Sequence, residues 1–138
     1  MRDVAPGAAG SLFVVAGAAG SLFACTPAGG WQCASLQARL PADQAGGAAV
    51  TSVAVDAADT RVVYASAKRD VFLADNAVMR SVDGGATFER LVLDAPLAGD
   101  ALQGPHEVSW LRVQPRTRAL WAAGECFGLW TAPAPALE

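Results

Sequence analysis

Apolar and polar residues alternate along much of this 138-residue chain, and a period of two is typical of β-strands with one buried face. The clearest run is Val50–Val55, which the polar segment Asp56–Arg61 separates from a second apolar run. Prolines and paired glycines interrupt the alternation and mark connections between strands. We expect no helix longer than a short turn. The expected strands cover residues 11–16, 21–26, 31–36, 50–55, 62–67, 77–82, 87–93, 108–113, 119–123 and 128–131.

Two internal repeats organise this pattern. Gly7–Phe13 recurs identically at Gly17–Phe23, which predicts a hairpin of strands 11–16 and 21–26 joined by a Gly-Ala-Ala-Gly turn. At longer range, Val50–Val55 matches residues 108–113 at an offset of 58, and Thr60–Ala65 matches residues 117–122 at an offset of 57. One sheet module is therefore repeated within a single partial domain. Its three units are expected at about residues 8–37, 50–93 and 107–132.

The segment Ser81-Val82-Asp83-Gly84-Gly85-Ala86-Thr87-Phe88 lies between two apolar runs and predicts a tight turn between strands. Asp83 is expected to accept hydrogen bonds from backbone N–H groups two and three residues on, and the two glycines permit positive φ. The segment resembles the Asp-box of BNR-repeat β-propellers, whose pattern is Ser-x-Asp-x-Gly-x-Thr followed by Trp or Phe. The matching positions are Ser81, Asp83, Gly85, Thr87 and Phe88.

This resemblance implies an all-β fold made of propeller blades with four antiparallel strands. In that family the motif closes the hairpin between the third and fourth strands, so its role is structural. Trp31 lies 57 residues before Phe88, which places Thr26 at the position of Asp83 in a degenerate first motif. The chain then supplies about two and a half to three blades, with strands two to four in the first.

Closed propellers need roughly four to eight blades, so the ring is expected to be incomplete. The remaining blades belong either to the same longer chain or to other copies. We favour a carboxy-terminal fragment of a longer chain.

Composition excludes several classes of protein. A hydrophobic content of 53% with 17% charged residues excludes a disordered tail, and a net charge of −3 argues against nucleic acid as a partner. Cys25 and Cys33 are a candidate disulfide if they face each other across a hairpin, with buried free thiols as the alternative. Cys126 would stay unpaired. The cysteine spacing and the single histidine fit no metal site, and we expect no cofactor.

The uncharged stretch Val4–Cys25 has a second interpretation as a targeting segment, because Leu22–Cys25 superficially resembles a bacterial lipobox. That interpretation would anchor the chain through a lipid on Cys25. Asp3, Pro6 and the glycines argue against it, as does Phe23, which stands where a lipobox prefers a small or β-branched residue. We favour strands here and expect no membrane span.

No spacing rule identifies a catalytic pair. A glycosidase needs two carboxylates about 5–10 Å apart across the sugar, and either Asp70 with Asp75 or Asp100 with Glu107 would supply them. Solvated loop acids are the simpler interpretation. Sialidase relatives use an arginine triad, a tyrosine nucleophile with a supporting glutamate and an aspartate, but the only tyrosine, Tyr64, has the spacing of a core aromatic.

Candidate binding residues lie in the connections between the expected strands, except Trp110, which lies in the expected strand 108–113. They are Asp70, Asp75, Asp100, His106, Glu107 and Trp110. Trp31, Trp110, Trp121 and Trp130 are candidates for a sugar-stacking platform, although their repeat positions favour packing between blades, least clearly for Trp110. The leading hypothesis is a non-catalytic propeller module for protein or glycan binding, secreted or in the cell envelope. The alternative is a fragment of a sialidase-like or xyloglucanase-like glycoside hydrolase whose catalytic residues lie mostly elsewhere.

Overall fold

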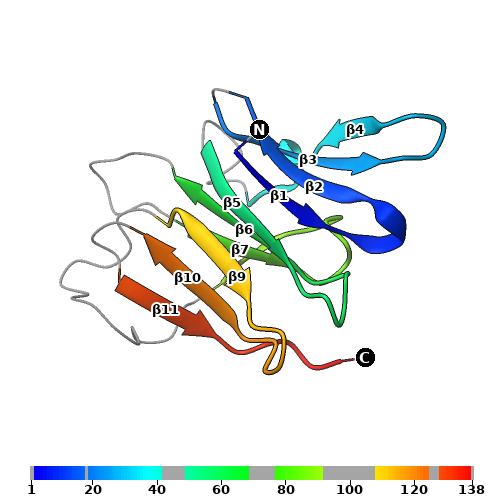
Figure 1. Ribbon diagram of the computed structural model, residues 1–138. Coiled ribbons are helices and arrows are strands. Elements are labelled where there is room, and N and C mark those ends of the chain that lie inside the picture. Colours follow the sequence, from blue (N-terminus) through cyan, green and yellow to red (C-terminus); the bar gives the residue numbers. More distant parts are fainter. Residues whose placement is uncertain are drawn as a thin grey trace.

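The computed structural model describes residues 2–17, 19–41, 49–68, 77–91, 108–124 and 128–137. These residues form eleven strands and two short 3-10 turns, η1 (Ala8–Gly10) and η2 (Gln37–Arg39). The strands build three antiparallel sheets that lie side by side (Figure 1). The protein is all-β, with blades of an incomplete β-propeller, as the sequence predicts. None of the described helices is long and apolar enough to cross a membrane.

The first sheet contains one strand that the sequence pattern did not predict. Its strands, in order, are β1 (Asp3–Pro6), β2 (Leu12–Ala16), β3 (Ser21–Thr26) and β4 (Gln32–Ser35). This sheet therefore begins at Asp3, ahead of the expected start near residue 8, and has four strands where three were expected. Strand β1 is too short to show alternation and ends in a proline, which strands tolerate at their edges. Its pairing with β2 runs from Asp3 opposite Val15 to Pro6 opposite Leu12.

Both copies of the Gly-Ala-Ala-Gly repeat connect strands of this sheet. The second copy joins β2 to β3, whose closest pair is Ala16 opposite Ser21, and Gly17 and Gly20 have φ values of 83° and 68°. This hairpin confirms the prediction for strands 11–16 and 21–26. The first copy contains η1 and joins β1 to β2. Both copies of the repeated sequence therefore join neighbouring strands.

The second and third sheets follow the longer repeat. The second consists of β5 (Ala49–Val55), β6 (Val63–Lys68), β7 (Ala77–Ser81) and β8 (Glu89–Leu91), in that order. The third consists of β9 (Trp110–Val113), β10 (Leu120–Gly124) and β11 (Gly128–Ala132). Strands β5 and β9 begin their sheets, and β6 and β10 take the second position in each. The described residues supply no fourth strand to the third sheet.

Two hydrophobic cores hold the sheets together. The first lies between the first and second sheets and includes Phe13, Leu22 and Met79. The second lies between the second and third sheets and includes Tyr64 and Leu120, neither of which is accessible to solvent. Tyr64 is thus the core aromatic that its repeat position predicts.

Strands β1, β5 and β9 are neighbours in space, because β5 packs against both of the others. Each begins its own sheet, so these three strands lie where the sheets meet, and we call them the inner strands (Figure 1). Since the strands alternate in direction, β6 and β8 end where β7 and β9 begin, and we call this the loop end. The β5–β6 and β7–β8 connections lie at the opposite end, which we call the turn end.

Candidate functional site

The turn from Ser81 to Phe88 is held by a compact set of side-chain hydrogen bonds. Asp83 accepts bonds from the Thr87 backbone N–H at 2.9 Å and the Thr87 hydroxyl at 2.5 Å, and its Oδ1 accepts the Ser81 hydroxyl at 2.7 Å. Ser81 Oγ in turn accepts the backbone N–H groups of Asp83 and Gly85 at 3.3 and 2.8 Å. The N–H two residues after Asp83 therefore bonds to Ser81, which corrects the expectation that Asp83 would accept it.

These bonds favour the ionised form of Asp83. The hydroxyl and backbone N–H of Thr87 lower its pKa most, followed by the Ser81 hydroxyl, and bring it to about 2 from 3.8. A general acid or base working near neutral pH needs a pKa close to the working pH. The geometry and the lowered pKa both fit a carboxylate that stays charged and holds a turn.

The same turn also fixes the second sheet against the first. A Cβ at Gly85 would lie 3.1 Å from Phe13 Cε1 and 3.4 Å from Leu36 Cδ1, so the glycine backbone packs directly on the first sheet. Arg39 Nη1 donates to the Gly85 carbonyl at 3.3 Å. Phe88 packs against the first core, partly buried. The turn is therefore a contact between blades as well as a hairpin closure.

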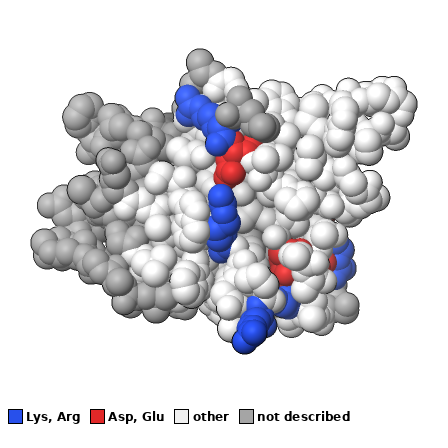
Figure 2. Space-filling view, in the orientation of Figure 1, with Lys and Arg blue, Asp and Glu red and all other residues white. Residues whose placement is uncertain are grey.

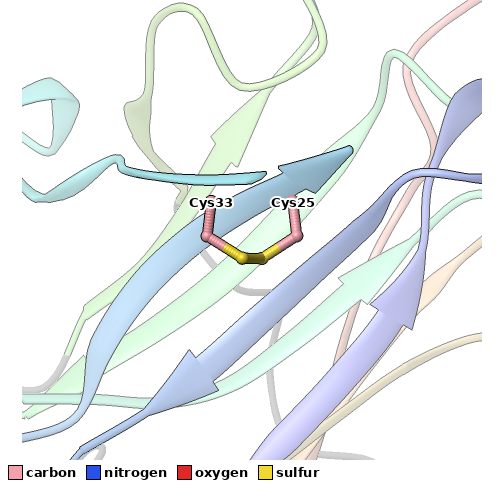
Figure 3. The surroundings of a disulfide bond; sticks show 2 residues. All are labelled: Cys25 and Cys33. Carbon is pink, nitrogen blue, oxygen red and sulfur yellow. A yellow bond between two sulfur atoms is a disulfide. The ribbon is translucent and has the colours of Figure 1, made fainter. Parts of the chain in front are cut away.

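The corresponding turn of the first sheet uses a disulfide in place of this network. Cys25 on β3 and Cys33 on β4 are directly opposite each other and form a disulfide (Figure 3). The turn between them has positive φ at Gly29 and Gly30, 71° and 94°, close to the 72° and 91° of Gly84 and Gly85. The turns therefore match at an offset of 55. At this offset Thr26 is equivalent to Ser81, which corrects the expectation that Thr26 is equivalent to Asp83.

A chain of polar contacts joins the three inner strands, which the sequence pattern did not predict. Asp3 Oδ2 accepts the Ser52 hydroxyl at 2.6 Å and the Val53 N–H at 3.0 Å, and Ser52 Oγ accepts the Leu111 N–H at 3.1 Å. Arg112 Nη1 lies 3.9 Å from Asp3 Oδ2. The first and second sheets thereby each offer an acceptor to the next inner strand. A serine and an aspartate in alternating segments carry no such signal in the sequence.

A buried ion pair joins the second and third sheets at the turn end. Arg118 Nε donates to Asp56 Oδ2 at 2.7 Å, and the Asp56 and Arg118 side chains are 2% and 14% exposed. Asp56 Oδ1 also accepts the Ala58 N–H at 2.9 Å. Arg118 has a positive φ of 60°, which a residue with a Cβ rarely adopts. This contact was also missed, because the two residues lie 62 positions apart.

The four tryptophans differ in how far they are buried. Trp130 packs partly buried against the second core, as expected for packing between blades. Trp31, Trp110 and Trp121 are 59%, 36% and 37% exposed, so within the described residues they are not enclosed between sheets, which corrects that expectation. The Arg112 guanidinium lies 5.5 Å from the centroid of the Trp110 ring, in range for a cation–π contact.

Every carboxylate that the structure describes has a hydrogen-bond or ion-pair partner. The five are Asp3, Asp56, Asp59, Asp83 and Glu89. Asp59 pairs with Arg61 at 2.8 Å, and this hydrogen bond is the main cause of its lowered pKa. Glu89 pairs with Arg80 at 2.6 Å. No group of three potential metal ligands occurs among the described residues.

Five of the six predicted binding residues fall outside the part of the chain that the structure describes. Asp70, Asp75, Asp100, His106 and Glu107 lie outside the described residues, and only Trp110 is described. The strands that flank the first two, β6 and β7, meet the loop end, as do the strands β8 and β9 that flank the other three.

Two surface hollows are lined by described residues. One of about 240 Å³ lies along the inner strands and is lined mainly by apolar side chains, with Arg112 the charged one among them. The other, of about 300 Å³, is lined by the Asp59–Arg61 and Arg80–Glu89 pairs. On the face shown in Figure 2 the charged groups form small patches of mixed sign. This face carries no continuous basic stripe among the described residues.

Comparison with known proteins shows the fold. The chain is similar to the GH74 xyloglucanase from Xanthomonas campestris, with a TM-score of 0.68 and 24% identity over 93% of this chain and 20% of that one. It is also similar to a GH74 enzyme from Niastella koreensis, with a TM-score of 0.66 and 17% identity over 96% of this chain and 20% of that one. The chain thus spans about a fifth of the length of either enzyme. No protein-family model and no curated protein sequence matches it.

Proposed function

We propose that this chain is a non-catalytic segment of an Asp-box β-propeller that binds a glycan or a protein through connections at its loop end. The observation that carries the proposal is that each of the five described carboxylates is engaged in a hydrogen bond or ion pair with another residue of the chain. Asp83 is the centre of a turn network, and its pKa is lowered to about 2. The BNR interpretation rests on this turn, whose five motif positions all match.

The loop end is the proposed binding surface. The candidate residues Asp70, Asp75, Asp100, His106 and Glu107 all lie in sequence between strands that meet this end. Rings of connections on a rigid sheet scaffold are a common location for binding residues. We infer a location outside the cytoplasm, because disulfides such as Cys25–Cys33 persist in oxidising compartments.

A second candidate function is a segment of a glycoside hydrolase, which the similarity to two GH74 enzymes favours. Under this hypothesis Asp70 with Asp75, or Asp100 with Glu107, supplies one or both catalytic carboxylates at the loop end. Other parts of the catalytic centre then lie on further blades.

Xyloglucan oligosaccharides test the two hypotheses together. Calorimetry of the chain should show binding, while reducing-sugar release should show no hydrolysis. The paired variants Asp70→Asn with Asp75→Asn, and Asp100→Asn with Glu107→Gln, should weaken binding, and Val82→Ala at the turn end is the matched control. Hydrolysis that either paired variant abolishes would establish the enzyme instead. Binding that survives both pairs unchanged would rule out the loop-end site.

A further inference from the structure

The outer strand of the first sheet, β4, has few contacts that hold it in place. Among the described strands it pairs with β3 alone, over four residue pairs. All four of its side chains are exposed, so none of them enters either of the two described cores. Short segments with exposed backbone hydrogen bonds and few buried contacts open most readily. The Cys25–Cys33 disulfide is the covalent tie between this strand and β3.

The equivalent strand of the second sheet, β8, has side-chain anchors that β4 lacks. The matched turns place Cys25 at the position of Arg80. Cys33, directly opposite Cys25, then has the position of Glu89. Arg80 and Glu89 form an ion pair at 2.6 Å, and the turn network and Phe88 also fix the start of β8. In the first sheet the disulfide takes the place of these side-chain contacts.

The disulfide lies where a reductant can reach it. Cys33 is exposed, whereas Cys25 is 4% exposed. The equivalent Glu89 side chain is 61% exposed, although it lies on the face of the second sheet that carries Tyr64 and packs on the third sheet. A further sheet over the same face of the first sheet would therefore leave Cys33 accessible. Exposed disulfides are more readily reduced than enclosed structural ones.

The chain that follows β4 is anchored independently of the disulfide. Leu36 belongs to the first core, and its N–H donates to the Leu22 carbonyl at 2.9 Å. Arg39, three residues further on, donates to the Gly85 carbonyl. Neither contact involves a cysteine. Opening of β4 therefore ends at Leu36 and leaves the contact between the first and second sheets in place.

We propose that the Cys25–Cys33 disulfide is a redox-sensitive switch that opens and closes residues 27–35. A thiolate of a dithiol reductant attacks the sulfur of the exposed Cys33 and forms a mixed disulfide, and Cys25 leaves as a thiolate that takes up the proton lost by the attacking thiol. The second thiol then closes the reductant's own disulfide and passes its proton to Cys33. One disulfide is thereby reduced and one is formed. The proposal goes beyond the proposed function and does not depend on ligand binding.

Hydrogen exchange of the native 138-residue chain, with and without dithiothreitol, tests this proposal. Reduction should speed exchange of the β4 amides at least about tenfold, because the bond no longer restrains this short edge strand. The amides of Leu36, Val53 and Leu111 should exchange as slowly as before. The double variant Cys25→Ser with Cys33→Ser is the matched control: its β4 amides should exchange fast without dithiothreitol and show no further change with it.

Three results would overturn the proposal. A disulfide that resists dithiothreitol in the folded chain would show that the bond is enclosed. Equal exchange of the β4 amides in the oxidised and reduced chains would show that the backbone ladder alone holds the strand. Fast exchange that spreads to Leu36 and Val53, with loss of the strand signal in circular dichroism, would make the disulfide a constraint on the whole fold and leave no local switch.

Discussion

Replacing Asp83 with alanine removes the centre of the turn network in the second sheet. The substitution deletes three accepted hydrogen bonds, from the Thr87 backbone N–H, the Thr87 hydroxyl and the Ser81 hydroxyl. The side chain is exposed, so water partly replaces these bonds, and each contributes about 0.5–1 kcal/mol. We therefore expect Asp83→Ala to lower the free energy of unfolding by about 1–3 kcal/mol. For a chain of this length that corresponds to roughly 3–10 °C in Tm.

The loss of stability in Asp83→Ala should become smaller as the pH falls. The pKa of Asp83 is about 2 in the folded protein against 3.8 for the unperturbed group, so the unfolded chain binds this proton more readily. The carboxylate contribution is complete above the unfolded pKa and is lost as pH falls through 3.8 toward 2. The stability difference between wild type and Asp83→Ala should accordingly narrow over that interval.

Urea unfolding followed by circular dichroism between pH 7 and pH 2 measures this difference. Val82→Ala is the matched control, because it changes an exposed side chain in the same turn without touching the network. A difference that is absent at pH 7, or that stays constant down to pH 2, would refute the assignment of Asp83 to folding. Loss of a binding or hydrolytic activity at full stability would refute it as well.

Three further predictions concern the contacts between sheets and the first hairpin. Gly85→Ala should destabilise the protein more than Gly84→Ala. Both glycines have positive φ, but only a Cβ at Gly85 would lie 3.1 Å from Phe13. Equal decreases in Tm for the two variants would contradict the contact. Breaking the buried Asp56–Arg118 pair by Asp56→Ala should lower the free energy of unfolding by about 3–5 kcal/mol, and a loss below about 1 kcal/mol in urea would show that the pair is solvated. Replacing Cys25 and Cys33 with alanine should lower the free energy of unfolding by about 2–3 kcal/mol, because the disulfide closes a loop with a sequence separation of 8. A thiol assay on the unreduced wild type should count one free thiol per chain, and three reactive thiols would exclude the disulfide.

Much of the scaffold follows from local pattern. The alternation in residues 50–55 and the offset of 57 to 58 predict the second and third sheets, because period two and repetition are properties of the sequence itself. The missed strand β1 also had a signal. The first Gly-Ala-Ala-Gly copy is a turn, and a turn before β2 requires a strand ahead of it. Its four residues were too few for alternation to show.

The contacts between sheets were not predictable in the same way. Asp3 and Ser52 are 49 residues apart, and Asp56 and Arg118 are 62 apart, so only the packed fold brings each pair together. The exposure of Trp121 likewise depends on which sheet lies against it, because the equivalent Tyr64 is buried by a neighbour. Sequence spacing identifies equivalent positions in the repeat, whereas burial at each position depends on the completeness of the ring.

Nuclear Overhauser contacts between the inner strands test the arrangement of the sheets most directly. We expect contacts from the Val53 amide to β1 and from the Leu111 amide to Ser52, since these N–H groups donate to Asp3 Oδ2 and Ser52 Oγ. Both amides should also exchange slowly with solvent. Backbone contacts that place β9 beside β1 in the position of β5, or rapid exchange at both amides in a folded chain, would contradict the order of the blades.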